Sequence, residues 1–221
     1  MKRSNPPSAR FKIVYEDDAI IAVDKPSGIL VVPSPKESKM TLSNQINKYL
    51  DDKGISVNAY PCHRLDRGTS GIILYAKGKR IQKIVMAEFK EKRIQKRYAA
   101  FVRGTPRTTT GTIRSAIYNR NKMTYQSAVT KYRVVEVRKG FSVVDVEPLT
   151  GRTNQIRIHF AKIGNPILGE RMFAFGKDFK IKFRRLALHA RSLSLRHPIS
   201  NERVSLTAPM PEDMARFIGA K

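Results

Sequence analysis

The chain has 221 residues, 41% of them hydrophobic, and carries 43 Lys and Arg against 18 Asp and Glu, a formal net charge of +25. This length suffices for one sizeable hydrophobic core. A single cysteine excludes an internal disulfide and a cysteine-rich zinc site, and no apolar run is long enough to span a membrane. The charge indicates a polyanionic partner, and without a separate basic amphipathic segment nucleic acid is favoured over an anionic membrane surface.

The N-terminal part of the chain predicts a basic tail followed by a hairpin. Residues 1–10 are polar, predict a flexible tail and lack the apolar run of a signal peptide, so a cytoplasmic protein is expected. Residues 11–15 and 19–23 predict two strands around an acidic turn. Lys25 lies on the Pro/Gly loop that leaves the second strand, where it can face a substrate phosphate or be an ordinary surface lysine.

Helical spacing of apolar residues predicts two amphipathic helices. Thr41 can cap the first, and the second is expected over residues 79 to about 92. The stretch 77–97 carries nine Lys and Arg and only two acidic residues. This basic face is either an ordinary solvated helix surface or a surface that contacts RNA phosphates, and the scarcity of acids favours the phosphates.

One acidic residue stands out between these helices. Asp66 lies between Arg64 and Arg67, ahead of a Gly-Thr-Ser-Gly turn and of an apolar run at 72–76 that predicts a buried strand. The two arginines favour the ionised carboxylate. Such a carboxylate on a tight loop suits a nucleophile, a general base or an anchoring charge, although the same pattern is also ordinary turn chemistry with surface ion pairs.

The middle of the chain is rich in β-branched and aromatic residues. Strands are predicted at 96–103, 112–118, 128–137 and 141–146. The chain shows no β-α-β rhythm and no Gly-x-Gly phosphate loop. These patterns predict an α+β fold in one domain over residues 11–221, with a mixed, mostly antiparallel sheet flanked by helices and loops and with a central cleft.

A short helix is predicted after these strands, capped by Thr153 or Asn154. Arg152 lies just ahead of it and Arg157 inside its first turns, where an arginine can pair a carboxylate or a phosphate bidentately. The remaining elements are predicted as a basic mobile insertion at 173–183, a strand at 184–188 and a closing helix at 211–218.

With these stretches side by side, the chain resembles the pseudouridine synthases of the RluA family. The order and spacing of its motifs agree with the family from about residue 11 to residue 210. The motifs similar to those of the family are Asp24 to Gly28, His63 to Asp66 with Thr69 to Gly71, Lys96 to Tyr98, Thr150 to Arg152 with Gln155 to His159, and Leu188 to Ala190 with His197-Pro198. The S4 module that precedes many members has no room in this chain, so the basic body and tail are expected to hold the RNA.

The resemblance implies isomerisation of uridine in RNA, in which the base is detached from C1′, turned and rejoined through its C5. That reaction requires no cofactor and no metal. The implied partner is a stem-loop of ribosomal or transfer RNA, with no membrane and, by default, a monomer. The rivals are a non-catalytic RNA-binding or ribosome-assembly protein of the same fold, and a DNA-binding protein, for which the chain lacks a helix-turn-helix or zinc pattern.

The resemblance also implies roles for individual residues. Asp66 is the essential carboxylate at C1′, Arg157 pairs with it and keeps it ionised, and Tyr98 stacks on the uracil and can serve in proton transfer. Arg64 is the candidate to fill the space that the flipped nucleotide vacates. Other residues expected to bind the substrate are Leu188, which lines the uracil pocket, Thr69, Arg152 and Lys25.

The chain departs from the family's pattern at four positions. Asn154 and Asn165 stand where histidine is usual, and Glu170 and Phe173 replace a common Asp and Tyr. We expect these positions around the site rather than in it, so that they affect the choice of target more than the chemistry. His63, inside the aspartate motif, is expected to be a structural histidine.

Overall fold

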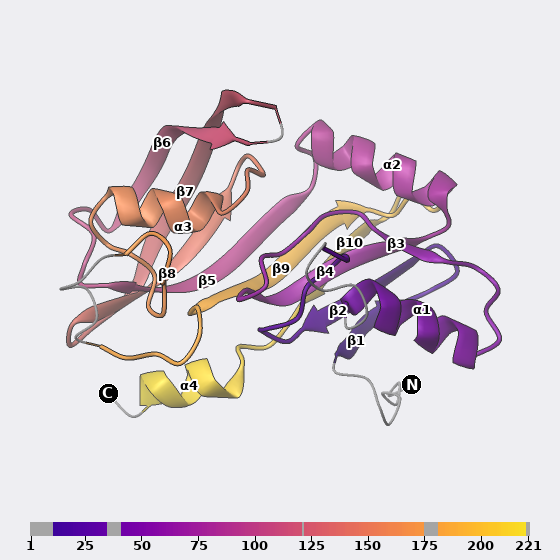
Figure 1. The fold of residues 1–221 in the computed structure, drawn as a ribbon, viewed down its shortest axis with the longest axis horizontal. Helices are drawn as coiled ribbons and strands as arrows, with labels where there is room; N and C mark the ends of the chain where they lie inside the picture. The colour runs from indigo at the N-terminus through magenta and orange to yellow at the C-terminus, as the bar shows by residue number, and fades with distance from the viewer. Residues whose placement is uncertain (1–10, 35–40, 121, 175–180, 220–221) are drawn as a thin grey trace. The chain divides into compact units, whose positions relative to one another are not determined.

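The computed structural model describes residues 11–34, 41–120, 122–174 and 181–219, which form two compact units (Figure 1). Unit 1 runs to Gln95 and resumes from Ala190 to Pro209, whereas unit 2 runs from Lys96 to His189 and resumes at Met210. The predicted tail at 1–10 and residues 175–180 of the predicted insertion lie outside the described residues. The predicted domain boundary at residue 11 and the central cleft stay predictions.

Unit 1 is a sheet with two helices. Strands β1 (Lys12–Glu16), β2 (Ile20–Lys25) and β4 (Ser70–Lys77) pair in antiparallel order, and β3 (Ala59–Pro61) also pairs with β4. The strand β9 (Leu188–Arg196) neighbours β4, and β10 (Arg203–Thr207) pairs with β9. The predicted hairpin around the acidic turn is confirmed. The predicted strand at 184–188 is wrong, because β9 begins only at Leu188 and residues 184–187 form no strand.

The two helices of unit 1 confirm the helical spacing of the sequence. Helix α1 (Leu42–Asp52) begins after Thr41, whose side chain accepts a hydrogen bond from the Asn44 amide at 3.3 Å, and it buries its apolar face. Helix α2 (Lys79–Lys90) buries only Ile81 and Val85, so its other residues stay largely exposed. None of the helices in the described ranges is long and apolar enough to cross a membrane.

The start of β4 is a place of close backbone approach. Gly71 has φ +108°, and a Cβ placed on it would lie 2.2 Å from the carbonyl oxygen of Ala190 in β9. Every residue of β4 is buried. Only glycine combines this backbone conformation with so near a neighbour, so Gly71 allows the strand after Asp66 to lie against β9.

Unit 2 is an antiparallel sheet covered by helices. Its strands stand in the order β5 (Gln95–Arg103), β8 (Phe141–Pro148), β7 (Thr124–Arg138) and β6 (Thr110–Asn119). Helix α3 (Gln155–Lys162) contacts β6, β7 and β8, and helix α4 (Glu212–Gly219) places Phe217 against Phe101 and Phe141. The helices and antiparallel ladders of the two units confirm the α+β class.

Candidate active site

Asp66 lies on the loop at 62–69 that joins β3 to β4. The Thr69 amide donates to the carbonyl oxygen of Asp66 at 3.0 Å and closes a tight turn. Asp66 is half-buried, Arg64 and Arg67 are exposed, and Thr69 is buried. The loop therefore presents one partly exposed carboxylate between two exposed cations, as its sequence predicts.

A second loop, at 26–29, fastens the C-terminal side of the Asp66 turn. The Gly28 amide donates to the Arg67 carbonyl at 2.7 Å, and Arg67 Nε donates back to the Gly28 carbonyl at 2.9 Å. Ser27 Oγ donates to the Gly68 carbonyl at 2.7 Å. These bonds involve backbone atoms on at least one side, so they fix the path of the chain next to Asp66.

Lys25, which is buried beneath these two loops, also holds them together. Its side chain is fully buried, and its ammonium donates to the carbonyls of Pro26 at 3.0 Å, Ile29 at 2.9 Å and Arg67 at 3.2 Å. The prediction of an exposed lysine, whether facing a phosphate or merely solvent, is therefore wrong. A buried ammonium is stable only when its three donors find acceptors, and here the carbonyls of both loops supply them.

His63 fastens the other side of the turn. Its Nε2 accepts a hydrogen bond from the Leu74 amide of β4 at 3.1 Å, and its ring lies 4.9 Å from that of Phe89 in α2. Since Nε2 is the acceptor, a neutral imidazole carries its proton on Nδ1. The expectation of a structural histidine agrees with this contact. Burial of the neighbouring Cys62 raises the pKa of its thiol to about 12, which makes this thiol unreactive.

In unit 2, Tyr98 lies on β5 opposite Val146 of β8, and only 9% of it is exposed. Alternate residues of a strand point to opposite faces. Arg97 accordingly points to the other face, where it pairs with Asp145 at 3.1 Å and Glu147 at 3.5 Å. The tyrosine ring therefore lies on the face of β5 opposite to the ion pairs of Arg97.

Lys96 shares the strand face of Tyr98. Its Nζ lies 3.9 Å from the position that a Cβ on Gly151 would take, beside the turn that precedes α3. Burial lowers the pKa of the Lys96 ammonium from its ordinary value. Strand β5, which carries Tyr98, and the turn at 150–152 therefore meet at Lys96.

Arg157 of α3 is held by three side chains. Its Nε and Nη2 donate to the two carboxylate oxygens of Glu170 at 2.6 and 2.8 Å, and its Nη1 donates to Asn154 Oδ1 at 2.8 Å. Its Cζ lies 5.2 Å from the ring centre of Phe173. The arginine side chain is 13% exposed and that of Glu170 is fully buried. We call this set of four residues the Arg157 clamp.

The carboxylate of the Arg157 clamp is ionised. Burial opposes ionisation of Glu170, but the hydrogen bonds and charge of Arg157, with the amides of Met172 and Phe173, outweigh it and lower the pKa of Glu170. A fork-to-fork pair of this kind fixes the plane of the guanidinium. Glu170 therefore sets the direction in which Arg157 presents its remaining N–H groups.

Three of the four departures from the family's pattern lie in this clamp. Asn154, Glu170 and Phe173 contact Arg157 directly, whereas Asn165 donates to the Arg103 carbonyl. The sequence predicts these positions around the site, and the structure adds that three of them share Arg157 as their partner. Opposite charges thirteen residues apart across a loop follow no local spacing rule, so the pairing of Arg157 with Glu170 has no signal in the sequence.

The N-cap of this helix is Asn154, one of the two predicted positions, but its side chain does not make the expected capping bond. Asn154 adopts a left-handed conformation with φ 55°, and no side chain at the N-cap bonds a backbone amide of the helix. The amide oxygen of Asn154 is used by Arg157 instead. The turn before the helix is held by Gln155, whose Oε1 accepts from Thr150 Oγ1 at 2.6 Å and from the Arg152 amide at 3.0 Å.

The same glutamine connects this turn to β7. Gln155 Nε2 donates to the Val129 carbonyl at 3.0 Å and to Thr130 Oγ1 at 2.9 Å. Arg152 Nε donates to the Ser127 carbonyl of β7 at 3.2 Å. Arg152 therefore lies along the strand, and its charge stays near the surface.

The structure thus brings the predicted residues together in two groups. Unit 1 holds the Asp66 loop with Arg64, Thr69 and the buried support Lys25. Unit 2 holds Tyr98, Arg152, Arg157 and Leu188, the last of these 3% exposed at the start of β9.

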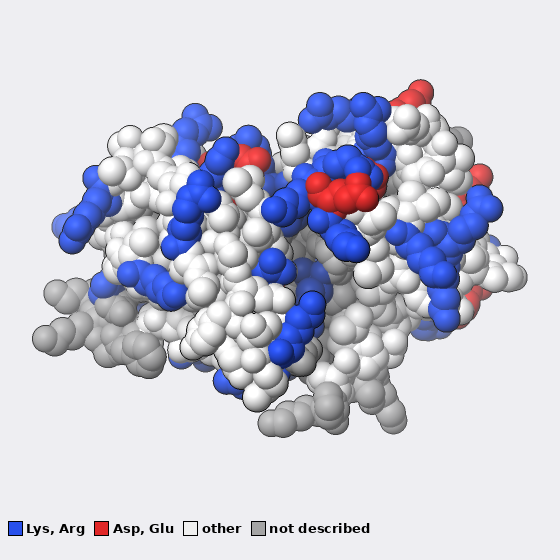
Figure 2. Space-filling view, turned by 90° about the horizontal axis from the view of Figure 1, so that it is seen from above, with Lys and Arg blue, Asp and Glu red and all other residues white. Residues whose placement is uncertain are grey.

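Cations cover much of the surface. Figure 2 shows a face on which Lys and Arg side chains are widely spread and Asp and Glu side chains are few. On and just after α2, the exposed cations are Lys79, Arg80, Lys83, Lys90, Lys92 and Arg93. Arg93 is paired with Glu88 and Glu91. The other five cations leave the helix with the basic exposed face that its sequence predicts.

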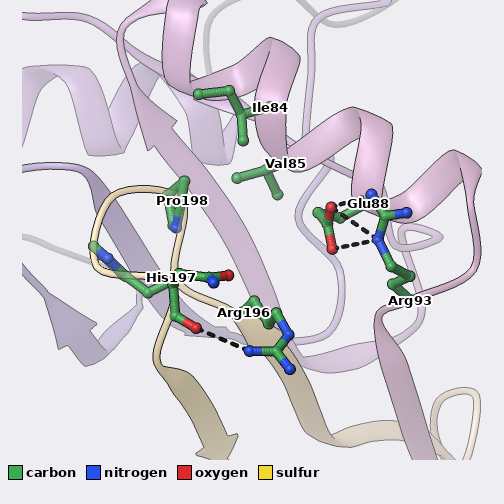
Figure 3. Close-up of a pocket in the computed structure, with 8 residues that line it drawn as sticks. Ile84, Val85, Glu88, Arg93, Arg196, His197 and Pro198 are labelled. Atoms are coloured by element: carbon green, nitrogen blue, oxygen red, sulfur yellow. Dashed lines mark hydrogen bonds and ion pairs between the residues drawn. The ribbon is translucent and has the colours of Figure 1, made fainter.

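A cavity of about 440 Å³ lies in unit 1 between α2 and the turn that follows β9. Figure 3 shows Ile84 and Val85 projecting from α2 toward this turn, with Glu88 and Arg93 paired beside them. None of the residues predicted for the site lines this cavity. Two arginines line the cavity: Arg93 is paired with Glu88 and Glu91, and Arg196 donates to the Asn201 carbonyl.

Comparisons with known proteins show the family and the fold of the chain. The chain matches the family model of RNA pseudouridylate synthase over residues 19–162. It is 33% identical over 219 residues to YhcT, an uncharacterized RNA pseudouridine synthase of Bacillus subtilis. The aligned region covers 95% of this chain and 72% of that relative. It is 34% identical to ribosomal large subunit pseudouridine synthase D of Zymomonas mobilis, over 96% of this chain and 73% of that one. The solved structure of human RNA pseudouridylate synthase domain containing 4 shares the fold, with a TM-score of 0.79 at 21% identity, over 94% of this chain and 92% of that one.

Proposed function

The chain belongs to the RluA-type RNA pseudouridylate synthases, which convert uridine in RNA to pseudouridine, and from this premise we propose that it isomerises specific uridines of a folded RNA with Asp66 as its essential carboxylate. The observation that carries the proposal is the fastening of the Asp66 loop. Hydrogen bonds with the loop at 26–29 on one side, and the bond that His63 accepts from the Leu74 amide on the other, hold a half-buried carboxylate between two exposed arginines. Such preorganisation is what a reacting group requires.

Asp66 acts at C1′ of the target nucleotide. Its carboxylate attacks C1′ or stabilises the positive charge that develops there as the glycosidic bond breaks, and the detached base turns and rejoins through C5. Arg157 supplies the positive charge that keeps Asp66 ionised when both act on the same nucleotide. Glu170 supports this role as a positioning residue, because it fixes the plane of the guanidinium.

Tyr98 and Leu188 receive the base. Tyr98 stacks on the uracil and its hydroxyl serves in proton transfer, while Leu188 lines the pocket. Both side chains are almost fully buried, which supports a closed, rigid receptor. A flat ring held by the β5 and β8 ladder loses little conformational freedom when a base stacks on it.

The target nucleotide is flipped out of the RNA. Arg64 is exposed beside Asp66 and long enough to fill the vacated space. The hydroxyl of Thr69 is buried and has no hydrogen-bond partner among the residues that the structure describes, so it is a candidate to bond the flipped nucleotide. Arg152 and the exposed cations of α2 bind the flanking phosphates.

A ribosomal RNA stem-loop in the cytoplasm is the favoured target, and the protein acts as a monomer. The support for ribosomal RNA is that relatives about a third identical to this chain are named ribosomal large subunit pseudouridine synthase D. Flipping is easiest where stacking is already weak, which favours a loop over a continuous helix. A stem-loop of transfer RNA is the second target to test.

The test is nucleoside mass spectrometry with carbodiimide mapping on RNA from cells that lack this protein. The cells are complemented with wild type, with Asp66→Ala, with the isosteric Asp66→Asn, or with the control Asp18→Asn at an exposed acid of unit 1. We expect one or a few pseudouridines to vanish without the protein and to return with wild type and Asp18→Asn only. Turnover of Asp66→Asn in vitro should fall more than about a thousandfold while RNA binding persists.

The alternative of a non-catalytic RNA-binding or ribosome-assembly protein predicts the opposite result. If Asp66→Asn and Asp66→Ala restore every site, or if no pseudouridine depends on the protein, Asp66 has no catalytic role. The protein would then only bind RNA through its basic surface. Growth and ribosome assembly, measured in the same complemented cells, should then be restored by Asp66→Asn as well as by wild type.

A further inference from the structure

The hairpin of β6 and β7 has one face that takes no part in the site described above. The strands pair from Thr110 opposite Arg133 to Asn119 opposite Thr124. On one face, Ile113, Ile117 and Ala128 are buried, and α3 contacts both strands (Figure 1). The residues that alternate with them point away from α3, so the hairpin has a free outer face.

Two tyrosines stand at the tip of this outer face. Tyr118 and Tyr125 are direct cross-strand partners, and their ring centres lie 5.2 Å apart at an angle of 58°. Tyr118 is 42% exposed, Tyr125 71% and the adjacent Met123 75%. Tyr118 Oη donates to Met123 Sδ at 3.4 Å. The two rings pack on each other and stay exposed beside Met123, so their faces are open to a partner.

The charge around these rings is uniformly positive. From Lys92 to Val135 the chain has eleven Lys and Arg and no Asp or Glu. Along the outer face, Arg114 and Lys131 follow the tyrosines away from the tip, and Arg120 and Lys122 flank them at the turn; all four are exposed. Beyond these four, Arg133 lies 3.9 Å from Asp145 of β8.

The hairpin is also joined to a residue of the proposed site. Arg152 donates to the carbonyl of Ser127, two residues from Tyr125 on β7. The Arg152 guanidinium therefore lies beside β7, two residues along the strand from Tyr125. A second copy of this chain does not fit the patch, because a partner with a net charge of +25 would be repelled by it.

We propose that the tip of this hairpin binds an unpaired segment of the RNA, with Tyr118 and Tyr125 stacking on bases and the four cations binding the adjoining phosphates. This inference rests on the proposed function for the identity of the partner. Phosphates attract the cations in paired and unpaired RNA alike, but ring faces stack only on bases that are not already stacked within a duplex. The tip therefore selects single-stranded RNA next to the target.

The chain has no tryptophan, so Tyr125→Trp places a single tryptophan at the tip, which can be excited apart from the tyrosines. The variant is titrated with a single-stranded RNA oligomer and with the same oligomer annealed to its complement. The control is Ile199→Trp, at a 65% exposed position in unit 1. We expect strong quenching at position 125 by the single strand and much weaker quenching by the duplex, with little quenching at position 199. Equal quenching by both RNAs, equal quenching at both positions, or quenching by anionic phosphatidylserine vesicles in place of RNA would overturn the proposal.

A second experiment separates stacking from charge. Tyr118→Ala with Tyr125→Ala should weaken single-strand binding by about 5- to 150-fold per lost stack without changing the slope of log affinity against log salt. Arg114→Gln with Lys131→Gln should instead reduce that slope by about 1.4. Both pairs are exposed, and an unchanged thermal midpoint verifies the fold. An unchanged affinity of the tyrosine variant overturns the proposal.

These measurements are repeated in the Asp66→Asn background. If the proposed function fails because Asp66 has no catalytic role, the quenching and the salt slopes stay as expected and the tip remains an RNA-binding element. If the tip proposal fails, single-strand binding survives the tyrosine changes while modification still depends on Asp66. The two failures therefore have different signatures.

Discussion

The Asp66 loop and the Arg157 clamp hold their functional side chains by different means. Around Asp66, the amide of Gly28, the hydroxyl of Ser27 and the ammonium of Lys25 all donate to backbone carbonyls of neighbouring loops. Around Arg157, a carboxylate, a side-chain amide and an aromatic ring contact the guanidinium itself. One region fixes the path of the backbone, and the other fixes one side chain.

The difference shows where substitutions can accumulate. A loop held through its backbone carbonyls tolerates many different side chains, except where a Cβ would collide with a neighbour. In the Arg157 clamp, in contrast, each substitution changes a contact of the guanidinium. The departures from the family's pattern at Asn154, Glu170 and Phe173 fall in the clamp. The matching motifs at 24–28 and 63–71 form the loop and its support.

The largest effect is expected from Gly71→Ala. The new Cβ would meet the Ala190 backbone at 2.2 Å in a conformation with φ +108°. We expect the free energy of unfolding to fall by more than about 3 kcal/mol in urea titrations. The control is Gly54→Ala, where φ is +72° and no atom lies within 4 Å, and where strain alone should cost about 1 kcal/mol. Equal losses in the two variants would contradict the close approach.

Lys25→Met tests the support of the Asp66 loop next. Loss of the ammonium removes the shared donor of three carbonyls, of which that of Arg67 keeps the Gly28 amide, at a cost of roughly 2 to 3 kcal/mol. Because Cys62 is the only cysteine and 6% exposed, its reaction rate with Ellman's reagent reports opening of this loop. The rate should rise in Lys25→Met and stay unchanged in Lys79→Met, an exposed lysine of the same unit. A rate equal to that of wild type would mean that Lys25 does not hold the loop.

Glu170→Gln keeps the shape of the Arg157 clamp and removes the negative charge of its carboxylate. We expect kcat to fall roughly 10- to 100-fold with KM nearly unchanged, because the guanidinium is no longer fixed in its plane. Glu202→Gln, at an exposed acid, is the matched control. Single-turnover kinetics on a target RNA measure both constants. A rise in KM with kcat unchanged would assign Glu170 to RNA binding and not to the positioning of Arg157.

The smallest effect concerns pH and again falls on the helix of the clamp. Burial, and then the charge of Lys162, lowers the pKa of His159 to about 4. The unfolded chain therefore takes up this proton as the pH falls below about 6.5 while the folded chain does not, so stability is lost from pH 6.5 toward pH 4. Between pH 7 and pH 5.5 the loss should be roughly 1 kcal/mol. In urea titrations, the free energy of unfolding of His159→Leu should fall by about 1 kcal/mol less than that of wild type between pH 7 and pH 5.5. The same pH dependence in both proteins would contradict the lowered pKa of His159.

Elements with strong local patterns were predictable from the sequence. Helix α1 and helix α2 follow from apolar spacing, and β4 follows from one continuous apolar run. Asp66 between two arginines was recognisable because the motif is contiguous. In each case the signal and the structure lie within the same few residues.

Features that depend on distant backbone atoms were not predictable. The buried state of Lys25 is set by carbonyls, which every residue carries and no sequence distinguishes. The cap expected at Asn154 failed because its oxygen is claimed by Arg157, and that arginine is oriented by Glu170 across a loop. Here the partner decides the conformation, and the partner lies outside the reach of local patterns.

Unit 1 takes its strands from both ends of the described chain, and this has a consequence for the order of events during synthesis. Its strand β4 neighbours β9, yet the 94 residues from Lys96 to His189 are made in between. At roughly 5 to 20 residues per second, the ribosome needs roughly 5 to 20 s to supply the missing strand. Until then β4 lacks β9 as its neighbour, so a nascent chain completes the sheet beside the Asp66 loop only after residues 96–189 have been made.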